Sequence, residues 1–502
     1  MKRLLCFVLI ITSLSGLKGQ SPIQAVIPGD FADPSIISNG HQYFAVGTSS
    51  EWAPHFPIYK SSDLVNWKQV GYVFDKAPDW TVGSFWAPEF YFMNGKYYVY
   101  YTARRKSDNI SCIGVAVSDY PDRGYVDKGV LIDHGKEAID AYIFEDAGQR
   151  YISFKAYGLD KRPIELLATR LSPDGLRTVG EPFTLLKDDE RIGIEGQSFL
   201  KRGDYYYLFY SGGNCCGREC SYDLRVARSK KFEGPYERYA KNPILSENRD
   251  WKCSGHGSFV QDPKGKYFYL YHAYNKKSGV FTGRQGLLAE LSWPEGNDWP
   301  SFQPPVNNDK NTVQNIEDLF RSAKPALYWQ WDWRNSSPVI TQQKGELRLG
   351  GTVSERNNTG IALTVRPGKQ AFDISTRVMD SETMATNAVR GLVYYGDLNA
   401  ALGLGISGNQ VQIWQVKQNQ FEVLKSVQLS ATGPVELRIS VNDAHICRFF
   451  FKQSGNWEEI QTDEPVSADY LPQWDRSPRP GLHYKGATDE YARFSYFKLE
   501  YK

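Results

Sequence analysis

The chain has 502 residues, a length that suits two or three domains with packed cores. Its 59 Lys and Arg residues nearly balance 57 Asp and Glu residues, and the formal charge of +2 argues against nucleic acid or an anionic membrane as a partner. After residue 20, no stretch is long and apolar enough to predict a membrane span.

Residues 1–20 have the pattern of a secretory signal peptide. Lys2 and Arg3 give a basic start, an apolar run covers residues 4–11, and small residues lead to Gly19. We therefore expect an exported protein, either periplasmic or extracellular, in which disulfide bonds are permitted.

A hairpin pattern occurs five times within residues 21–295. Each copy has a short strand, a glycine turn, an aromatic strand that runs back, and a third strand that ends in a polar turn. The turn glycines are Gly40, Gly95, Gly148, Gly203 and Gly265. A period of roughly 50 residues built from short strands is typical of a β-propeller with one repeat per blade. We predict an all-β fold that begins with a five-bladed β-propeller over residues 21–295.

One chemically distinctive residue stands seven to nine positions before each turn glycine. These residues are Asp33, Trp86, Asp140, Glu195 and His256. Because the first strand of each blade lines the central channel, we expect them to converge on one axial site. Buried carboxylates are costly unless they are used, although these acids could instead cap strand ends or bind one another structurally.

The remaining channel positions allow more than one interpretation. Trp86 could be a stacking platform for a sugar ring, as the 14% aromatic content would suit, or a structural residue wedged between blades. Glu89 lies on the opposite strand face and is expected to be a structural ion-pair partner or a surface group. His256 could be a metal ligand, a charge partner or a hydrogen-bonded channel residue. Arg284 starts the third strand of blade five.

Four cysteines lie close to the predicted channel. Cys215, Cys216 and Cys220 cluster in the loop after the blade-four hairpin, and Cys253 precedes His256 in blade five. A bond from the cluster to Cys253 would join the two blades, and metal binding by the cluster is the alternative. The sequence does not determine the pairing.

The composition changes after the propeller. Residues 296–316 are rich in Pro and Asn and are predicted to be a linker. Residues 317–502 contain eight or more short alternating strands with polar turns, which indicate a β-sandwich domain.

The channel motifs resemble those of glycoside hydrolase family 43. The motifs are FADPS at residues 31–35, WAPE at 86–89, ID at 139–140, IEG at 194–196 and GHGS at 255–258. More weakly, residues 347–349 and 390–395 resemble the concanavalin-like (jelly-roll) sandwich that follows the propeller in β-xylosidases of that family.

The resemblance implies an exo-acting, inverting glycoside hydrolase that releases arabinofuranose or xylose from plant-derived polysaccharides or oligosaccharides. It implies Asp33 as the general base, Glu195 as the general acid, and Asp140 as the residue that tunes and orients the acid. Arg284 would contact the substrate. His256 would match a central His that often holds a calcium ion or a channel water, so a structural calcium could be bound although no cofactor is required. The motifs do not choose the sugar.

The chemistry sets conditions on these carboxyl groups. Inverting hydrolysis needs a protonated and an ionised carboxyl group roughly 6.5–9.5 Å apart, with water between them. Glu195 must hold a proton near neutral pH, so we expect like-charge repulsion from Asp140 to raise its pKa. The sandwich is expected to lean on the propeller and close one side of the pocket, which would make the enzyme exo-acting.

Three alternatives compete with this interpretation. One is a non-catalytic carbohydrate-binding propeller with a lectin-like sandwich, which needs no carboxylate trio. Another is a related propeller glycosidase acting on another sugar such as galactose or fructose; a retaining fructosidase would hold its two carboxyl groups only about 5–5.5 Å apart. A structural scaffold is the last. The sequence leaves the oligomeric state open.

Overall fold

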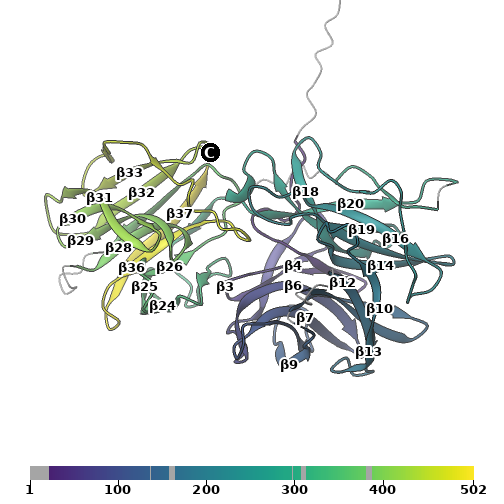
Figure 1. Cartoon of the computed structure of the whole chain (residues 1–502). Coiled ribbons are helices and arrows are strands. Elements are labelled where there is room, and N and C mark those ends of the chain that lie inside the picture. The colour runs from purple at the N-terminus through teal and green to yellow at the C-terminus, as the bar shows by residue number, and fades with distance from the viewer. Residues whose placement is uncertain (1–21, 136, 158–163, 297, 307–312, 380–386) are drawn as a thin grey trace, which may run out of the picture.

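The computed structural model describes residues 22–135, 137–157, 164–296, 298–306, 313–379 and 387–502, which form two β-rich bodies lying side by side (Figure 1). The predicted signal peptide, residues 1–20, lies outside these residues. Within them the helical structure is limited to one 3-10 turn, Gly279–Phe281, and no helix has the length and apolar character needed to cross a membrane. The predicted all-β class is confirmed.

The first body is the predicted five-bladed propeller, with four antiparallel strands in each blade. Blade one contains β1 (Ser35–Ser38), β2 (Tyr43–Val46), β4 (His55–Ser61) and β5 (Lys68–Phe74). Blade two contains β6 (Thr81–Met93), β7 (Lys96–Arg105), β8 (Ser111–Ser118) and β9 (Val126–Ile132). Blade three contains β10 (Glu137–Asp146), β11 (Gln149–Tyr157), β12 (Glu165–Leu171) and β13 (Thr178–Lys187). Blade four contains β14 (Glu195–Arg202), β15 (Tyr205–Gly212), β16 (Asp223–Ser229) and β17 (Glu237–Arg238), and blade five β18 (Trp251–Gln261), β19 (Tyr267–Asn275), β20 (Arg284–Ser292) and β21 (Ser301–Phe302).

The segment expected to be a linker, residues 296–316, is not wholly a linker. β21 lies inside it and pairs with β20, so it completes blade five. β22 (Ile316–Asp318) begins at its end and pairs with β37 of the second body. The Pro and Asn content therefore conceals two short edge strands, because edge strands tolerate residues that central strands exclude.

The second body is the predicted β-sandwich of two antiparallel sheets. The larger sheet contains β24 (Ser336–Gln343), β25 (Glu346–Val353), β37 (Tyr491–Tyr501), β27 (Phe372–Val378), β32 (Val435–Val441), β33 (Ile446–Lys452) and β34 (Glu458–Ile460), with β22 beside β37 and β35 (Val466–Ser467) beside β33. The smaller sheet contains β26 (Ile361–Thr364), β36 (Arg479–Lys485), β28 (Val389–Asp397), β29 (Ala400–Ser407), β30 (Gln410–Lys417) and β31 (Gln420–Gln428). Residues along β32 alternate between buried and half-buried, as expected when one sheet face packs on a core.

The sandwich is fixed to the propeller close to the channel. β3 (Trp52–Ala53) leaves blade one and pairs with β23 (Trp331–Asp332), between the two bodies in Figure 1. The Trp52 side chain is only 1% exposed, and the Arg479 guanidinium lies 4.1 Å from its ring centre. Nearby, the Ser477 amide donates to Asp30 Oδ2 at 3.2 Å. This docking fixes the loop that precedes β36 against the mouth of the propeller.

We predict that Trp52→Ala lowers the stability of the joined protein by about 3–5 kcal/mol, because a large buried ring is removed from the contact between the two bodies. Chemical denaturation followed by circular dichroism measures the change. Trp474→Ala is the matched control, since that ring is 57% exposed. Equal destabilisation by both substitutions would contradict the role given to Trp52.

Candidate active site

One cavity of about 380 Å³ opens at the propeller axis. All six site residues expected from the sequence line it: Asp33, Trp86, Asp140, Glu195, His256 and Arg284. The same cavity is lined by residues of the sandwich loop, including Trp474 and Asp475, so the sandwich closes part of the pocket as expected. Strands from blades far apart in sequence thus meet at one pocket.

A β-bulge in the inner strand directs these side chains to the channel. In every blade one residue at this point has a left-handed backbone: Asp33 (φ 51°), Ala87 (44°), Asp140 (60°), Gly196 (57°) and His256 (37°). The strand register shifts there in blades two to five. Trp86 and Glu195 stand one residue before the left-handed position, so the five expected residues are equivalent only to within one position.

The left-handed residues are held by the neighbouring blade, which offsets the cost of a conformation that non-glycine residues rarely adopt. The hydroxyl oxygens of Thr48, Thr102 and Ser211 accept the amide N–H groups of Ala87, Asp140 and His256, at 2.8, 3.2 and 2.8 Å. Nδ1 of His272 accepts the Asp33 amide at 3.0 Å, which closes the ring between blades five and one. The bulges are therefore the joints between blades.

Lys155 interrupts this series. It lies opposite Ile139 in blade three, at the register that Thr102, Ser211 and His272 occupy in their blades. Instead of accepting an amide, its ammonium group lies 2.5 Å from Glu195 Oε2. The Gly196 amide donates to Asp140 Oδ2 at 3.1 Å instead. At this joint a cation therefore stands where the equivalent residues of other blades present a hydroxyl or imidazole group that accepts an amide.

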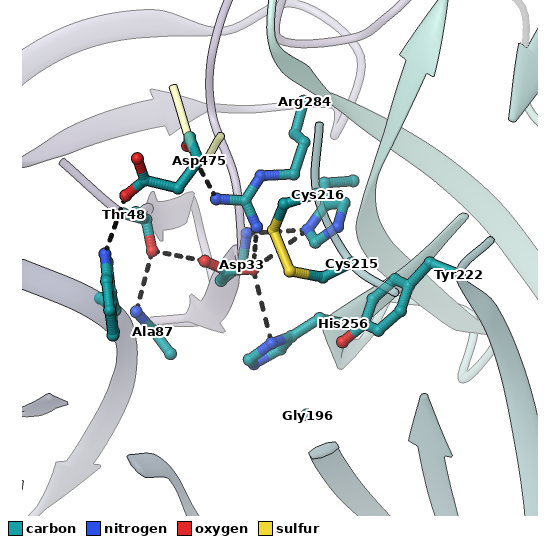
Figure 2. A network of polar contacts seen from close by, with 12 residues as sticks. Asp33, Thr48, Ala87, Gly196, Cys215, Cys216, Tyr222, His256, Arg284 and Asp475 are labelled. Carbon is teal, nitrogen blue, oxygen red and sulfur yellow. Dashed lines mark hydrogen bonds and ion pairs between the residues drawn. A yellow bond between two sulfur atoms is a disulfide. The ribbon is translucent and has the colours of Figure 1, made fainter. Parts of the chain in front are cut away.

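Asp33 is surrounded by groups that favour its ionised form (Figure 2). Thr48 Oγ1 donates to its Oδ2 at 2.6 Å, and Arg284 Nη1 donates to its Oδ1 at 3.1 Å. Nδ1 of His256 lies 3.5 Å from the same oxygen. Burial acts to raise the pKa of Asp33, but the Arg284 guanidinium beside it outweighs burial, and the pKa is held well below its usual range. This carboxylate is ionised throughout the physiological range.

Glu195 does not have the raised pKa expected from the sequence. Burial acts to raise it, but the ion pair with Lys155 outweighs burial, and Tyr222 donates to Oε1 at 2.8 Å, so the pKa of Glu195 is lowered. Its neighbour Asp140 carries the raised pKa, at about 6, mainly because it is buried and also because Glu195 repels a second charge. The pKa values of the two acids are therefore well separated, but the raised value belongs to Asp140 and not to Glu195. The reason is that Lys155 contacts only Glu195 directly.

His256 stands between the carboxylates of Asp33 and Asp140, with Nδ1 3.5 and 3.9 Å from them. Calcium needs six to eight oxygen ligands, whereas the Asp33 oxygens already bind Arg284 and Thr48. Among the described residues no group of three or more His, Cys, Asp and Glu side chains is arranged to hold a metal. The free oxygen atoms around His256 are therefore too few to fit a calcium ion.

Glu89 is neither a surface group nor an ion-pair partner of the kind expected. Its side chain is 6% exposed, and it accepts hydrogen bonds from Ser35 Oγ at 2.6 Å and from the Ile143 amide at 3.2 Å. Burial raises its pKa to about 8. It joins blades one, two and three from within, because the bulge after Trp86 turns its side chain inward.

The cysteine cluster forms two disulfides. Cys220 is bonded to Cys253, which joins blades four and five as the sequence allowed. Cys215 is bonded to its neighbour Cys216, and both line the cavity. The cluster is therefore used for disulfides and not for a metal.

Sequence reasoning missed several residues at the site, among them Lys155, Tyr222, Trp474 and Asp475. Lys155 had a detectable signal, since it stands sixteen residues after Ile139, the spacing that separates Trp86 from Thr102. Asp475 accepts the Trp86 indole N–H at 3.3 Å, and its carbonyl accepts Arg284 Nη2 at 3.2 Å. Nothing in the sequence pattern links this sandwich loop to the propeller.

Comparison with known proteins agrees with this architecture. The sequence profile of glycosyl hydrolases family 43 matches residues 23–300, and that of the beta-xylosidase C-terminal concanavalin A-like domain matches residues 317–500. An extracellular exo-alpha-(1->5)-L-arabinofuranosidase of Cellvibrio japonicus is 30% identical over 306 residues, which cover 54% of this chain and 86% of the relative. A non-reducing end alpha-L-arabinofuranosidase of Bacteroides ovatus is 25% identical over 455 residues, 83% of this chain and 82% of the relative. The solved xylan beta-1,4-xylosidase of Bacillus halodurans has the same fold, with a TM-score of 0.82 at 19% identity over 96% of this chain and all of that one.

Proposed function

Because the chain belongs to glycosyl hydrolases family 43, it is a glycosidase, and we propose that it removes arabinofuranose or xylose from chain ends of plant cell-wall glycans with inversion. The observation that carries the proposal is the meeting of Asp33, Asp140 and Glu195 in one cavity. The arabinofuranosidase and xylosidase relatives support the choice of pentoses. The alternative of a non-catalytic lectin is wrong, since membership of this family indicates glycosidase activity.

Asp33 is the proposed general base. Its lowered pKa keeps it ionised, so it accepts a proton from the water that attacks the anomeric carbon. Arg284 binds Asp33 Oδ1 and the Asp475 carbonyl, and this fixes the carboxylate relative to the sandwich loop. Trp86 and Trp474 provide aromatic surface at the same cavity for the sugar.

Glu195 is the proposed general acid, and Asp140 is its proton partner. Below about pH 6 the two buried carboxyl groups hold a proton between them, which in the free protein resides on Asp140. A bound sugar excludes water and raises the pKa of the carboxyl group that it covers. Glu195 then gives the proton to the leaving oxygen, while Tyr222 and Lys155 stabilise the carboxylate that remains.

The sandwich supports an exo mode of action. Its loop before β36 places Trp474 and Asp475 at the cavity, so one side of an open propeller channel is covered. A pocket covered in this way accepts a chain end more readily than the middle of a polymer. Export to the periplasm or the cell exterior is proposed from the signal pattern of residues 1–20 and from the two disulfides.

We predict that Asp33→Ala lowers kcat about 10²- to 10⁴-fold on both nitrophenyl pentosides and natural oligosaccharides, because each needs the activated water. Glu195→Ala should affect oligosaccharides far more than nitrophenyl pentosides, since nitrophenolate leaves without a proton. Steady-state kinetics on both substrate types measures the contrast. Asp146→Ala, at the exposed ion pair with Lys201, is the control. Near-normal activity of Asp33→Ala would end the assignment.

We predict that the first-formed sugar has the anomeric configuration opposite to that of the substrate. A base that activates water on the face opposite the leaving group produces a single inversion. Proton NMR during the first minutes of hydrolysis, before mutarotation, identifies the anomer. Retention would instead favour the propeller glycosidase with a nucleophilic carboxylate.

We predict that Lys155→Met moves the alkaline limb of kcat/KM to higher pH by about 1 to 3 pH units. The acid must be protonated to act, and removal of the adjacent cation raises the pKa of Glu195 from its lowered position. A pH profile on an oligosaccharide measures the shift. Lys201→Met removes a comparable ion pair at the surface and should leave the profile unchanged. A limb that stays in place in Lys155→Met would reject Glu195 as the acid.

A further inference from the structure

The loop between β15 and β16, residues 213–222, contains three of the four disulfide cysteines, and its last residue contacts the proposed acid. Cys215 and Cys216 are bonded to each other, and Cys220 is bonded to Cys253. Tyr222, at the end of the loop, donates to Glu195. Only the bond between neighbours lies at the cavity, where Cys215 and Cys216 share the lining with Asp33, His256 and Arg284.

The Cys215–Cys216 bond contributes little to holding the chain together. Disulfide stabilisation through the unfolded chain grows with the length of the loop closed, and a bond between neighbours closes almost none. Cys220–Cys253, by contrast, joins residues 33 apart in sequence. The loop is also fixed by Arg218 Nη2, which donates to the Asp469 carbonyl at 2.7 Å, and by the Gly217 amide, which donates to Tyr274 OH at 3.2 Å. The bond between neighbours therefore has another use.

The Cys215–Cys216 disulfide presents an apolar surface to the cavity, and this surface suggests its use. A disulfide has no hydrogen-bond donor, and its sulfur atoms are polarisable and apolar in character. Figure 2 draws the pair in the same view as Asp33, His256 and Arg284, and the cavity that these residues line also contains the Trp86 and Trp474 rings. Because the bond also locks the peptide unit between its two residues, this apolar surface is rigid and loses little entropy when a ligand packs on it.

We propose that the Cys215–Cys216 disulfide is a substrate-binding element, a rigid apolar plate that packs on C–H groups of the pentose held at Asp33. The inference rests on the proposed function, because it assigns the pocket to a pentose ring. A sugar ring has hydroxyl groups for Arg284 and Asp33 and C–H groups that gain free energy on an apolar surface. The plate adds a rigid apolar surface to the aromatic surface that Trp86 and Trp474 give the same cavity.

The test compares two double variants. C215A/C216A removes the plate, and C220A/C253A removes the bond that anchors the same loop without lining the cavity. For C215A/C216A we expect KM for the preferred nitrophenyl pentoside to rise about 10-fold, with little change in the melting temperature. For C220A/C253A we expect a lower melting temperature and a much smaller change in KM. An unchanged KM in C215A/C216A overturns the proposal, as does an equal rise in both variants.

Calorimetric binding of L-arabinose and D-xylose separates this proposal from the proposed function. If the wild type hydrolyses no pentoside, the proposed function fails, and sugar binding alone tests the role of the disulfide. About 10-fold weaker binding in C215A/C216A than in the wild type supports that role. Equal binding by both proteins, or no binding by the wild type, overturns it. If C215A/C216A does not fold, C220A/C253A is measured before and after treatment with a phosphine, which reduces the remaining Cys215–Cys216 bond to two thiols as the phosphine is oxidised. The same change in sugar affinity is then expected.

Discussion

The structure depends on the left-handed backbone position that each blade places at the channel. At the channel every inner strand has a left-handed residue, and its amide hydrogen bonds to a side chain of the neighbouring blade. The same bulge that joins two blades also turns a side chain toward the axis. Assembly of the propeller and assembly of the pocket are therefore one event, and backbone strain at the site is offset by contacts between blades.

Lys155 makes one joint between blades chemically different from the others. Five similar joints would leave the carboxyl groups around the axis in similar surroundings. The cation contacts Glu195 directly, and it lowers the pKa of that acid while burial raises the pKa of Asp140. Asp33, across the pocket, is held ionised chiefly by the Arg284 guanidinium. Glu195 and Asp140 thereby acquire different protonation states, and in the free protein the proton is held by the partner of the proposed acid.

The pocket is completed by parts of the chain that lie outside the repeat. The sandwich loop brings Asp475 to Trp86 and Arg284, so docking of the two bodies affects the position of the groups beside Asp33. The loop of blade four brings an apolar disulfide to the same cavity. The propeller supplies the catalytic carboxyl groups, and these two insertions shape the space in front of them.

The sequence by itself determined the five blades and the convergence of Asp33, Asp140, Glu195 and His256, because a repeated hairpin projects similar positions onto one axis. It also determined the β-sandwich, since strand alternation is a local pattern. Only the tertiary structure decided that Lys155 pairs with Glu195, that Cys215 bonds to Cys216, that Glu89 is buried, and that Trp474 and Asp475 reach the pocket. These depend on the packing of neighbouring blades and on the docking of the sandwich, contacts between residues distant in sequence that no local periodicity records.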